Sequence, residues 1–179
     1  MKIAIFISGS ILFAVLFACS SESVSEKKTL AVKSRLEYQE LVINSHKAYL
    51  EKEKRRIDHF VDSLGIDFTA TQSGLRFAVL SSSNSEDSLI PGDVAVIDYT
   101  LTLLNGDTAY QSIVGKPQEF IVNMDNVEAG LHEGVQKLAV GDRAILILPA
   151  HLAHGITGDQ AAIPIQSPVV YYLSLLAKK

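Results

Sequence analysis

The chain has 179 residues, which is enough for one domain of ordinary size and an appendage. Its 16 basic and 20 acidic residues give a net charge of −4 at pH 7, so the composition offers nothing to a nucleic-acid backbone. The single cysteine excludes a disulfide within the chain, and stability must therefore come from a hydrophobic core.

The first eighteen residues have the three parts of a signal peptide. Met1 and Lys2 give a short positive start, and residues 3–17 are almost wholly apolar. This apolar run is shorter than the roughly twenty residues that a helix needs to span a bilayer. A small residue, Ala18, precedes Cys19 at the expected cleavage point. We therefore predict a signal peptide over residues 1–18.

The sequence Leu16-Phe17-Ala18-Cys19 resembles the lipobox of bacterial lipoproteins. The resemblance implies that Cys19 is lipidated and that several acyl chains hold the protein on a membrane of the Gram-negative cell envelope. Ser20 stands where some lipoproteins carry the Asp that retains them at the inner membrane. We therefore expect an outer-membrane location, with the protein facing the periplasm.

Residues 19–29 are polar and are predicted to form a flexible tether. Residues 30–64 are charged and free of Gly and Pro, and Gly65 follows as a helix stop, so we predict a helical arm. Apolar residues recur along it every seven positions, at Leu36, Ile43, Leu50, Ile57 and Leu64. The companion positions are mostly polar, which favours a solvated spacer helix whose last turns dock on the next domain. A homodimer through residues 30–64 is the alternative.

Residues 65–87 are predicted to be a connector that contains one strand, over residues 74–80. Residues 88–179 carry dense β signals and one helical pattern. In chain order they predict a strand at 95–103, a hairpin turn at Asn105-Gly106, a short strand at 119–122, an amphipathic helix at 127–138, a strand at 143–148 and a last strand from 169. This order predicts an α+β fold, in which four or five antiparallel strands curl over one short helix.

Several spaced motifs in residues 88–179 carry a family resemblance. They are Gly92-Asp93, Asp98-Tyr99, Asn105-Gly106, residues 127–135, residues 140–144, residues 149–155, Ile163-Pro164 and residues 170–176. Their order resembles the FKBP-type peptidyl-prolyl cis-trans isomerase domain. The resemblance implies isomerisation of proline-containing polypeptides without a cofactor or metal. With the lipid anchor and the helical arm, the chain is also similar to FKBP-like lipoproteins associated with gliding motility.

Prolyl isomerisation makes particular demands on a site. Rotation about an amide has a barrier of about 18–20 kcal/mol, but no covalent bond breaks, so neither a nucleophile nor a metal is required. The catalyst must bind the twisted amide better than either planar form. A concave apolar pocket meets this demand because it holds the proline ring and removes water from the carbonyl group.

The resemblance implies a set of pocket residues, and some match the family closely. Tyr99 matches the tyrosine of the pocket wall, and Val127 and Ile163 match aliphatic wall positions. Leu131 stands where many members have a floor tryptophan, and Tyr171 stands where the family has phenylalanine. These five residues predict an apolar pocket of the family type.

Other pocket positions depart from the family. Ala109-Tyr110 replaces a Phe-Asp pair, and Gln118 replaces another phenylalanine. Glu128 replaces an isoleucine whose backbone N–H the family uses, and His154 replaces a tyrosine whose hydroxyl reaches the ligand. The departures support a second hypothesis: a weak or inactive FKBP fold, retained as a binding or chaperone module in an envelope complex such as the gliding machinery.

His151 and His154 form a His-x-x-His pair, and His132 lies elsewhere in the sequence. No acidic ligand motif accompanies the pair. We therefore expect loop histidines, with His154 in the proline pocket, and no metal site.

Overall fold

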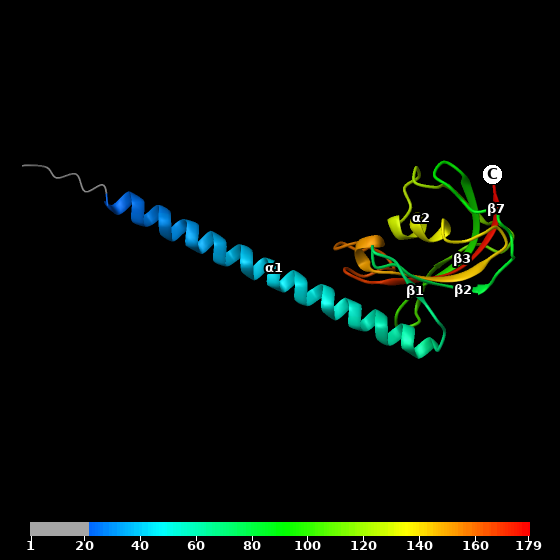
Figure 1. Ribbon diagram of the computed structural model, residues 1–179, viewed down its shortest axis with the longest axis horizontal. Coiled ribbons are helices and arrows are strands. Elements are labelled where there is room, and N and C mark those ends of the chain that lie inside the picture. The colour runs from blue at the N-terminus through cyan, green and yellow to red at the C-terminus, as the bar shows by residue number, and fades with distance from the viewer. Residues whose placement is uncertain (1–21) are drawn as a thin grey trace, which may run out of the picture. The chain divides into compact units, whose positions relative to one another are not determined.

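A computed structural model describes residues 22–179 of the chain (Figure 1). The predicted signal peptide and Cys19 lie outside these described residues. The chain divides after His46 into two compact units, and the second, residues 47–179, contains all of the sheet. From Glu22 onward no helix is both long enough and apolar enough to cross a membrane.

Helix α1 spans Glu22–Leu64 and so begins earlier than the predicted residue 30. The prediction of a flexible tether is therefore wrong for residues 22–29, while residues 19–21 lie outside the described chain. Residues 22–29 contain Glu and Lys but neither Gly nor Pro, so nothing in them stops the helix. The predicted helix end is confirmed, because Gly65 follows with φ +63° in the left-handed region.

The heptad positions of α1 differ sharply in burial. Leu36 is 55% exposed and Ile43 is 53% exposed, whereas Ile57 is only 3% exposed. Ile57 packs in a cluster with Ile147 and Val170 of the sheet. The last turns of α1 therefore dock on the domain, as predicted. Dimerisation through the exposed part of the helix stays a prediction.

The strands are antiparallel and form one sheet, so the predicted α+β class is confirmed. They are β1 (Thr69–Ala70), β2 (Arg76–Ser81), β3 (Val94–Leu103), β4 (Thr108–Gln111), β5 (Gln118–Ile121), β6 (Arg143–Leu148) and β7 (Val169–Lys178). The order is β1-β2-β6-β7-β3-β4, and β5 also pairs with β3. The described chain thus has more strands than the expected four or five, because β1 and β4 are too short to show a clear alternation.

Helix α2 (Ala129–Val135) packs against the concave face of the sheet, and two glycines allow the close approach (Figure 1). A Cβ at Gly134 would lie 2.4 Å from Leu146 Cδ1, and one at Gly130 would lie 2.5 Å from Leu148 Cγ. The opposite face of the sheet receives the last turns of α1. The main core therefore lies between α2 and the inner face of β3, β6 and β7.

The loop of residues 149–168 begins with the short 3₁₀ helix η1 (Ala150–Leu152) and joins β6 to β7. Helix α1 holds this loop near both ends. The backbone N–H of Ala150 donates to Glu53 Oε1 at 2.8 Å, and Glu53 is buried. The hydroxyl of Tyr49 lies 3.2 Å from both the carbonyl oxygen of Gln166 and Glu53 Oε1, and its one proton is shared between these two acceptors. The sequence did not predict either contact.

Candidate functional site

A pocket of about 320 Å³ gathers residues from β3, β4, β5, α2, β7 and the 149–168 loop. Seven of the eight predicted site residues line it: Tyr99, Tyr110, Val127, Glu128, Leu131, His154 and Tyr171. The remaining lining residues are Leu101, Gln118, Asn126 and Ala153. Ile163 is the exception, because it is buried in the main core with Leu131 and Tyr171 and does not line the pocket.

The apolar part of the pocket is built around two tyrosine rings. The ring centroids of Tyr99 and Tyr171 are 5.4 Å apart, with the planes tilted by 51°. Leu131 of α2 is 2% exposed and also lines the pocket. Burial, and then the charge of Glu128, raise the pKa of the Tyr99 hydroxyl, so this hydroxyl stays protonated. The rings and the leucine form a surface on which a proline ring can pack.

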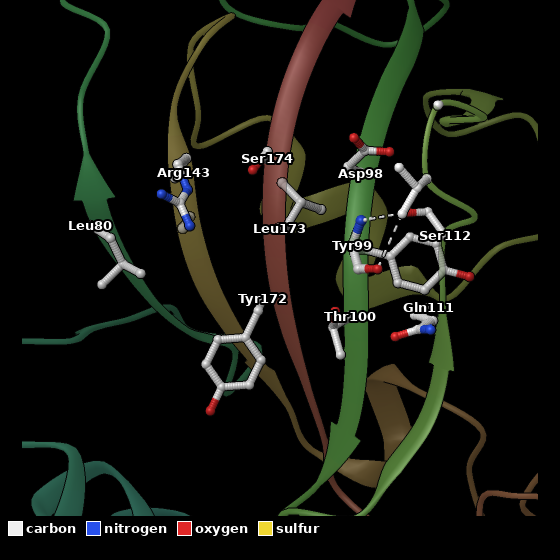
Figure 2. Close-up of a pocket in the computed structure, with 13 residues that line it drawn as sticks. Leu80, Asp98, Tyr99, Thr100, Gln111, Ser112, Arg143, Tyr172, Leu173 and Ser174 are labelled. Carbon is white, nitrogen blue, oxygen red and sulfur yellow. Dashed lines mark hydrogen bonds between the residues drawn. The ribbon is translucent and has the colours of Figure 1, made fainter.

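Hydrogen bonds with Ser112 fix the backbone of Tyr99 in β3, as Figure 2 shows. Its N–H donates to Ser112 Oγ at 3.1 Å, and Ser112 Oγ lies 3.3 Å from its carbonyl oxygen. The Ser112 N–H also donates to that carbonyl oxygen, at 3.0 Å. Ser112 follows β4 directly. This pairing holds the first residue of the pocket wall in place.

Figure 2 also shows a second hollow, of about 410 Å³, on the outer face of the sheet. It contains polar groups from three adjacent strands: Asp98, Ser174 and Arg143. Of the predicted site residues, only Tyr99 lines it. Although this hollow is the larger of the two, it does not bring the predicted residues together, so we assign the site to the inner pocket.

A polar cluster occupies one wall of the inner pocket. The hydroxyl of Tyr171 donates to Glu128 Oε1 at 2.9 Å, and His154 Nε2 also lies 2.9 Å from that oxygen without the alignment of a hydrogen bond. The side chain of Glu128 is 12% exposed. Burial foremost, and then Glu128, raise the pKa of Tyr171. Three residues that the resemblance marks as departures from the family therefore meet at one point.

The N-terminal end of α2 supplies a backbone donor beside this cluster. Glu128 is the N-cap residue of α2, and its own N–H makes no hydrogen bond to another described residue. The N–H that the resemblance assigns to substrate binding is therefore available at the pocket.

Tyr110 connects the pocket to the 149–168 loop, and this link was missed in the sequence. Its hydroxyl donates to Asp159 Oδ2. The other oxygen, Oδ1, accepts the N–H groups of Ala161 at 2.9 Å and Ile163 at 2.7 Å. The hydrogen bond from Tyr110 is the main cause that lowers the pKa of Asp159 to about 2. The sequence Gly158-Asp159 signals only a turn, so the pairing with Tyr110 had no local signal.

The three histidines of interest lie in separate places, and two of them have backbone hydrogen-bond partners. His151 Nε2 lies 2.9 Å from the carbonyl oxygen of Ser73, and His132 Nδ1 accepts the N–H of Asn123 at 2.9 Å. His154 lies in the pocket, as predicted. Over residues 22–179 no three His, Cys, Asp or Glu side chains gather as a metal site requires.

Comparisons with known proteins agree with the motifs. A family model described as FKBP-type peptidyl-prolyl cis-trans isomerase matches residues 86–176. FK506-binding protein 1 of Debaryomyces hansenii is 38% identical over 87 residues, which cover 48% of this chain and 78% of that protein. A peptidyl-prolyl cis-trans isomerase of Schizosaccharomyces pombe is 32% identical over 105 residues, covering 58% and 94% of the two chains. Peptidyl-prolyl cis-trans isomerase FPR2 of Saccharomyces cerevisiae is 30% identical over 125 residues, covering 67% and 93%.

Proposed function

The chain belongs to the FKBP-type peptidyl-prolyl cis-trans isomerase family, and on that premise we propose that it accelerates X-Pro isomerisation in exported polypeptides of the cell envelope. One observation carries the proposal: seven residues that are scattered over more than seventy positions of the sequence line a single pocket. Their side chains come from different strands, a helix and a loop, and they stand at the positions that the resemblance assigns to the family pocket, although Tyr110, Glu128 and His154 differ from the family residue there.

The pocket has the parts that this rotation needs. The proline ring packs against the surface formed by Tyr99, Tyr171 and Leu131. The free N–H of Glu128 then binds a substrate carbonyl beside the proline. Removing water from the amide favours the twisted form, because it is less charge-separated than the planar forms.

A protease-free assay on short X-Pro peptides tests the proposal, and no acceleration at high protein concentration would contradict it. Tyr99→Phe, which removes a hydroxyl from the pocket, should lower kcat/KM. Ile163→Ala should also lower it, because the buried core behind the pocket loses volume. Tyr172→Phe is the matched control, since it removes a hydroxyl from the outer face and should leave the rate unchanged. Unfolding of each variant should be measured first, so that loss of fold is not read as loss of catalysis.

The envelope part of the proposal depends on the lipobox resemblance of residues 16–19, with Cys19 as the lipidated residue. Mass spectrometry of the mature N-terminus and fractionation of the producing bacterium test it. We expect an acylated Cys19 in the outer membrane, and a Cys19→Ala variant without acyl chains. An uncleaved N-terminus or an unmodified cysteine would contradict lipid anchoring.

A second candidate function is a binding or chaperone module with little catalysis, serving an envelope complex such as the gliding machinery. The polar cluster of Glu128, His154 and Tyr171 favours it, because charge and hydroxyl groups replace part of the apolar wall. Suppression of aggregation of an unfolded client, with no acceleration of X-Pro peptides, would support this candidate over the first.

A further inference from the structure

The fixed charge of the inner pocket is negative. Glu128 carries the one carboxylate among the eleven lining residues, and none of the eleven is Lys or Arg. A second carboxylate, that of Asp159, lies beside the pocket on the hydroxyl of Tyr110. His154 is the one basic side chain among the lining residues. The pocket is therefore electrostatically suited to a positive group and unsuited to a negative one.

The carboxylate of Glu128 is held in place through one oxygen, and its other oxygen has no hydrogen-bond donor among the described residues. Its Oε1 atom receives the Tyr171 hydroxyl and lies close to His154 Nε2. Its Oε2 atom accepts no hydrogen bond from the described residues. The side chain is mostly buried yet lines the pocket, so a donor from a bound peptide can reach this oxygen. The hydrogen bond with Tyr171 therefore uses one oxygen of the carboxylate and leaves the other open to a ligand.

The position of Glu128 in the chain decides which part of a substrate it meets. In the proposed function its backbone N–H binds a carbonyl that flanks the proline. The side chain of the same residue then lies next to the side chain flanking the proline, and not below the proline ring itself. We propose that Glu128 makes the pocket selective for polypeptides with Lys or Arg immediately before the proline. This inference rests on the proposed function and names its substrate class.

The attraction between Glu128 and a basic side chain determines how large the substrate preference should be. Opposite charges in contact near a protein surface attract strongly at an effective dielectric constant of about 20, but desolvation and salt remove much of that gain. We expect kcat/KM for Lys-Pro to exceed that for norleucine-Pro by about tenfold, which corresponds to a net gain of about 1.4 kcal/mol. Norleucine is the matched residue because it has a similar chain without the charge. Glu-Pro should be the poorest substrate.

The experiment uses the full-length protein in neutral detergent and tetrapeptides that differ only before the proline. Wild type should prefer Lys-Pro, and Glu128→Gln should lose most of the preference while still accepting the Tyr171 hydroxyl. Glu133→Gln is the control, because Glu133 is also on α2 but hydrogen-bonds Ser73 outside the pocket. Equal rates for Lys-Pro and norleucine-Pro, or a preference that survives Glu128→Gln, would overturn the inference.

Failure of the proposed function gives a different result. In that case no peptide of the series is accelerated, whatever residue precedes the proline. Calorimetric titration of the same peptides then tests the charge preference by itself. Tighter binding of Lys-Pro that disappears in Glu128→Gln would support the inference without catalysis, and equal binding of all peptides would refute it.

Discussion

Tyr171 and Glu128, which the resemblance marks as departures from the family, are hydrogen-bonded to each other. Tyr171 is 3% exposed, so its hydroxyl requires an internal partner, and Glu128 Oε1 provides one at 2.9 Å. Glu128→Ile leaves that hydroxyl buried without a partner, which should cost about 1–3 kcal/mol of unfolding free energy. Tyr171→Phe removes a hydrogen bond to a charged group, which is worth about 1.5–3 kcal/mol.

The double variant Glu128→Ile/Tyr171→Phe should behave differently from either single one. It removes both polar partners and restores apolar side chains of similar shape, a change that can be nearly neutral. The interaction free energy of the double-mutant cycle should therefore be about 1–3 kcal/mol. Its pocket should also become more apolar, so kcat/KM for a peptide with Leu before the proline should rise.

Urea unfolding at pH 7, followed by circular dichroism, measures the four free energies of the cycle. Tyr172→Phe serves as the control, because Tyr172 is 38% exposed and its loss of a hydroxyl should change stability little. The m-values should stay constant, so that the midpoints report stability alone. Single-variant effects that add to the double-variant effect within about 0.5 kcal/mol would refute the reasoning.

Further predictions concern the support of the fold and are tested by unfolding. Burial raises the pKa of Asp142, but two backbone N–H groups and a hydroxyl bind its carboxylate and leave the pKa below its ordinary value. This stabilisation is present above the pKa of the unfolded state and is lost as the pH falls through the pKa of the folded state. Asp142→Asn should therefore lower the unfolding free energy by about 2 kcal/mol at pH 7, and by progressively less below pH 4. Gly134→Ala should cost about 1–3 kcal/mol, because its Cβ would lie 2.4 Å from Leu146; an unchanged midpoint would contradict this. Glu53→Ala should cost about 1–3 kcal/mol because the Ala150 N–H loses its buried acceptor, whereas Glu53→Gln, which keeps an acceptor oxygen, should cost less.

Much of the sheet could be predicted because its signals are local. The alternation of residues 95–103 reappears as β3, and Asn105-Gly106 forms the turn between β3 and β4. The last strand, from Val169, buries the alternate residues that its pattern indicated. A strand of two residues such as β1 has no period to detect, and an N-terminal helix boundary without a Pro or Gly has no marker. Those elements therefore escaped prediction.

The sequence predicted which residues line the candidate site, but it did not predict the hydrogen bonds between them. Position in the family motifs was enough to bring seven residues to one pocket. Which of them bond to one another depends on contacts between distant segments. Tyr110 and Asp159 are 49 positions apart, and Tyr171 and Glu128 are 43 apart, so no local pattern links either pair.

The same long-range contacts change the interpretation of helix α1. The sequence of this helix predicted a spacer that contacts the domain only through its last turns. In the structure its docked part also holds the loop that carries His154, through Glu53 near one end of the loop and Tyr49 near the other. Burial, and next the charge of Glu53, raise the pKa of Tyr49 to about 12, so its hydroxyl stays protonated in the neutral range and remains a donor to Gln166 and Glu53. Because the loop supplies one wall of the pocket, the geometry of that wall depends on a helix that lies outside the matched family region.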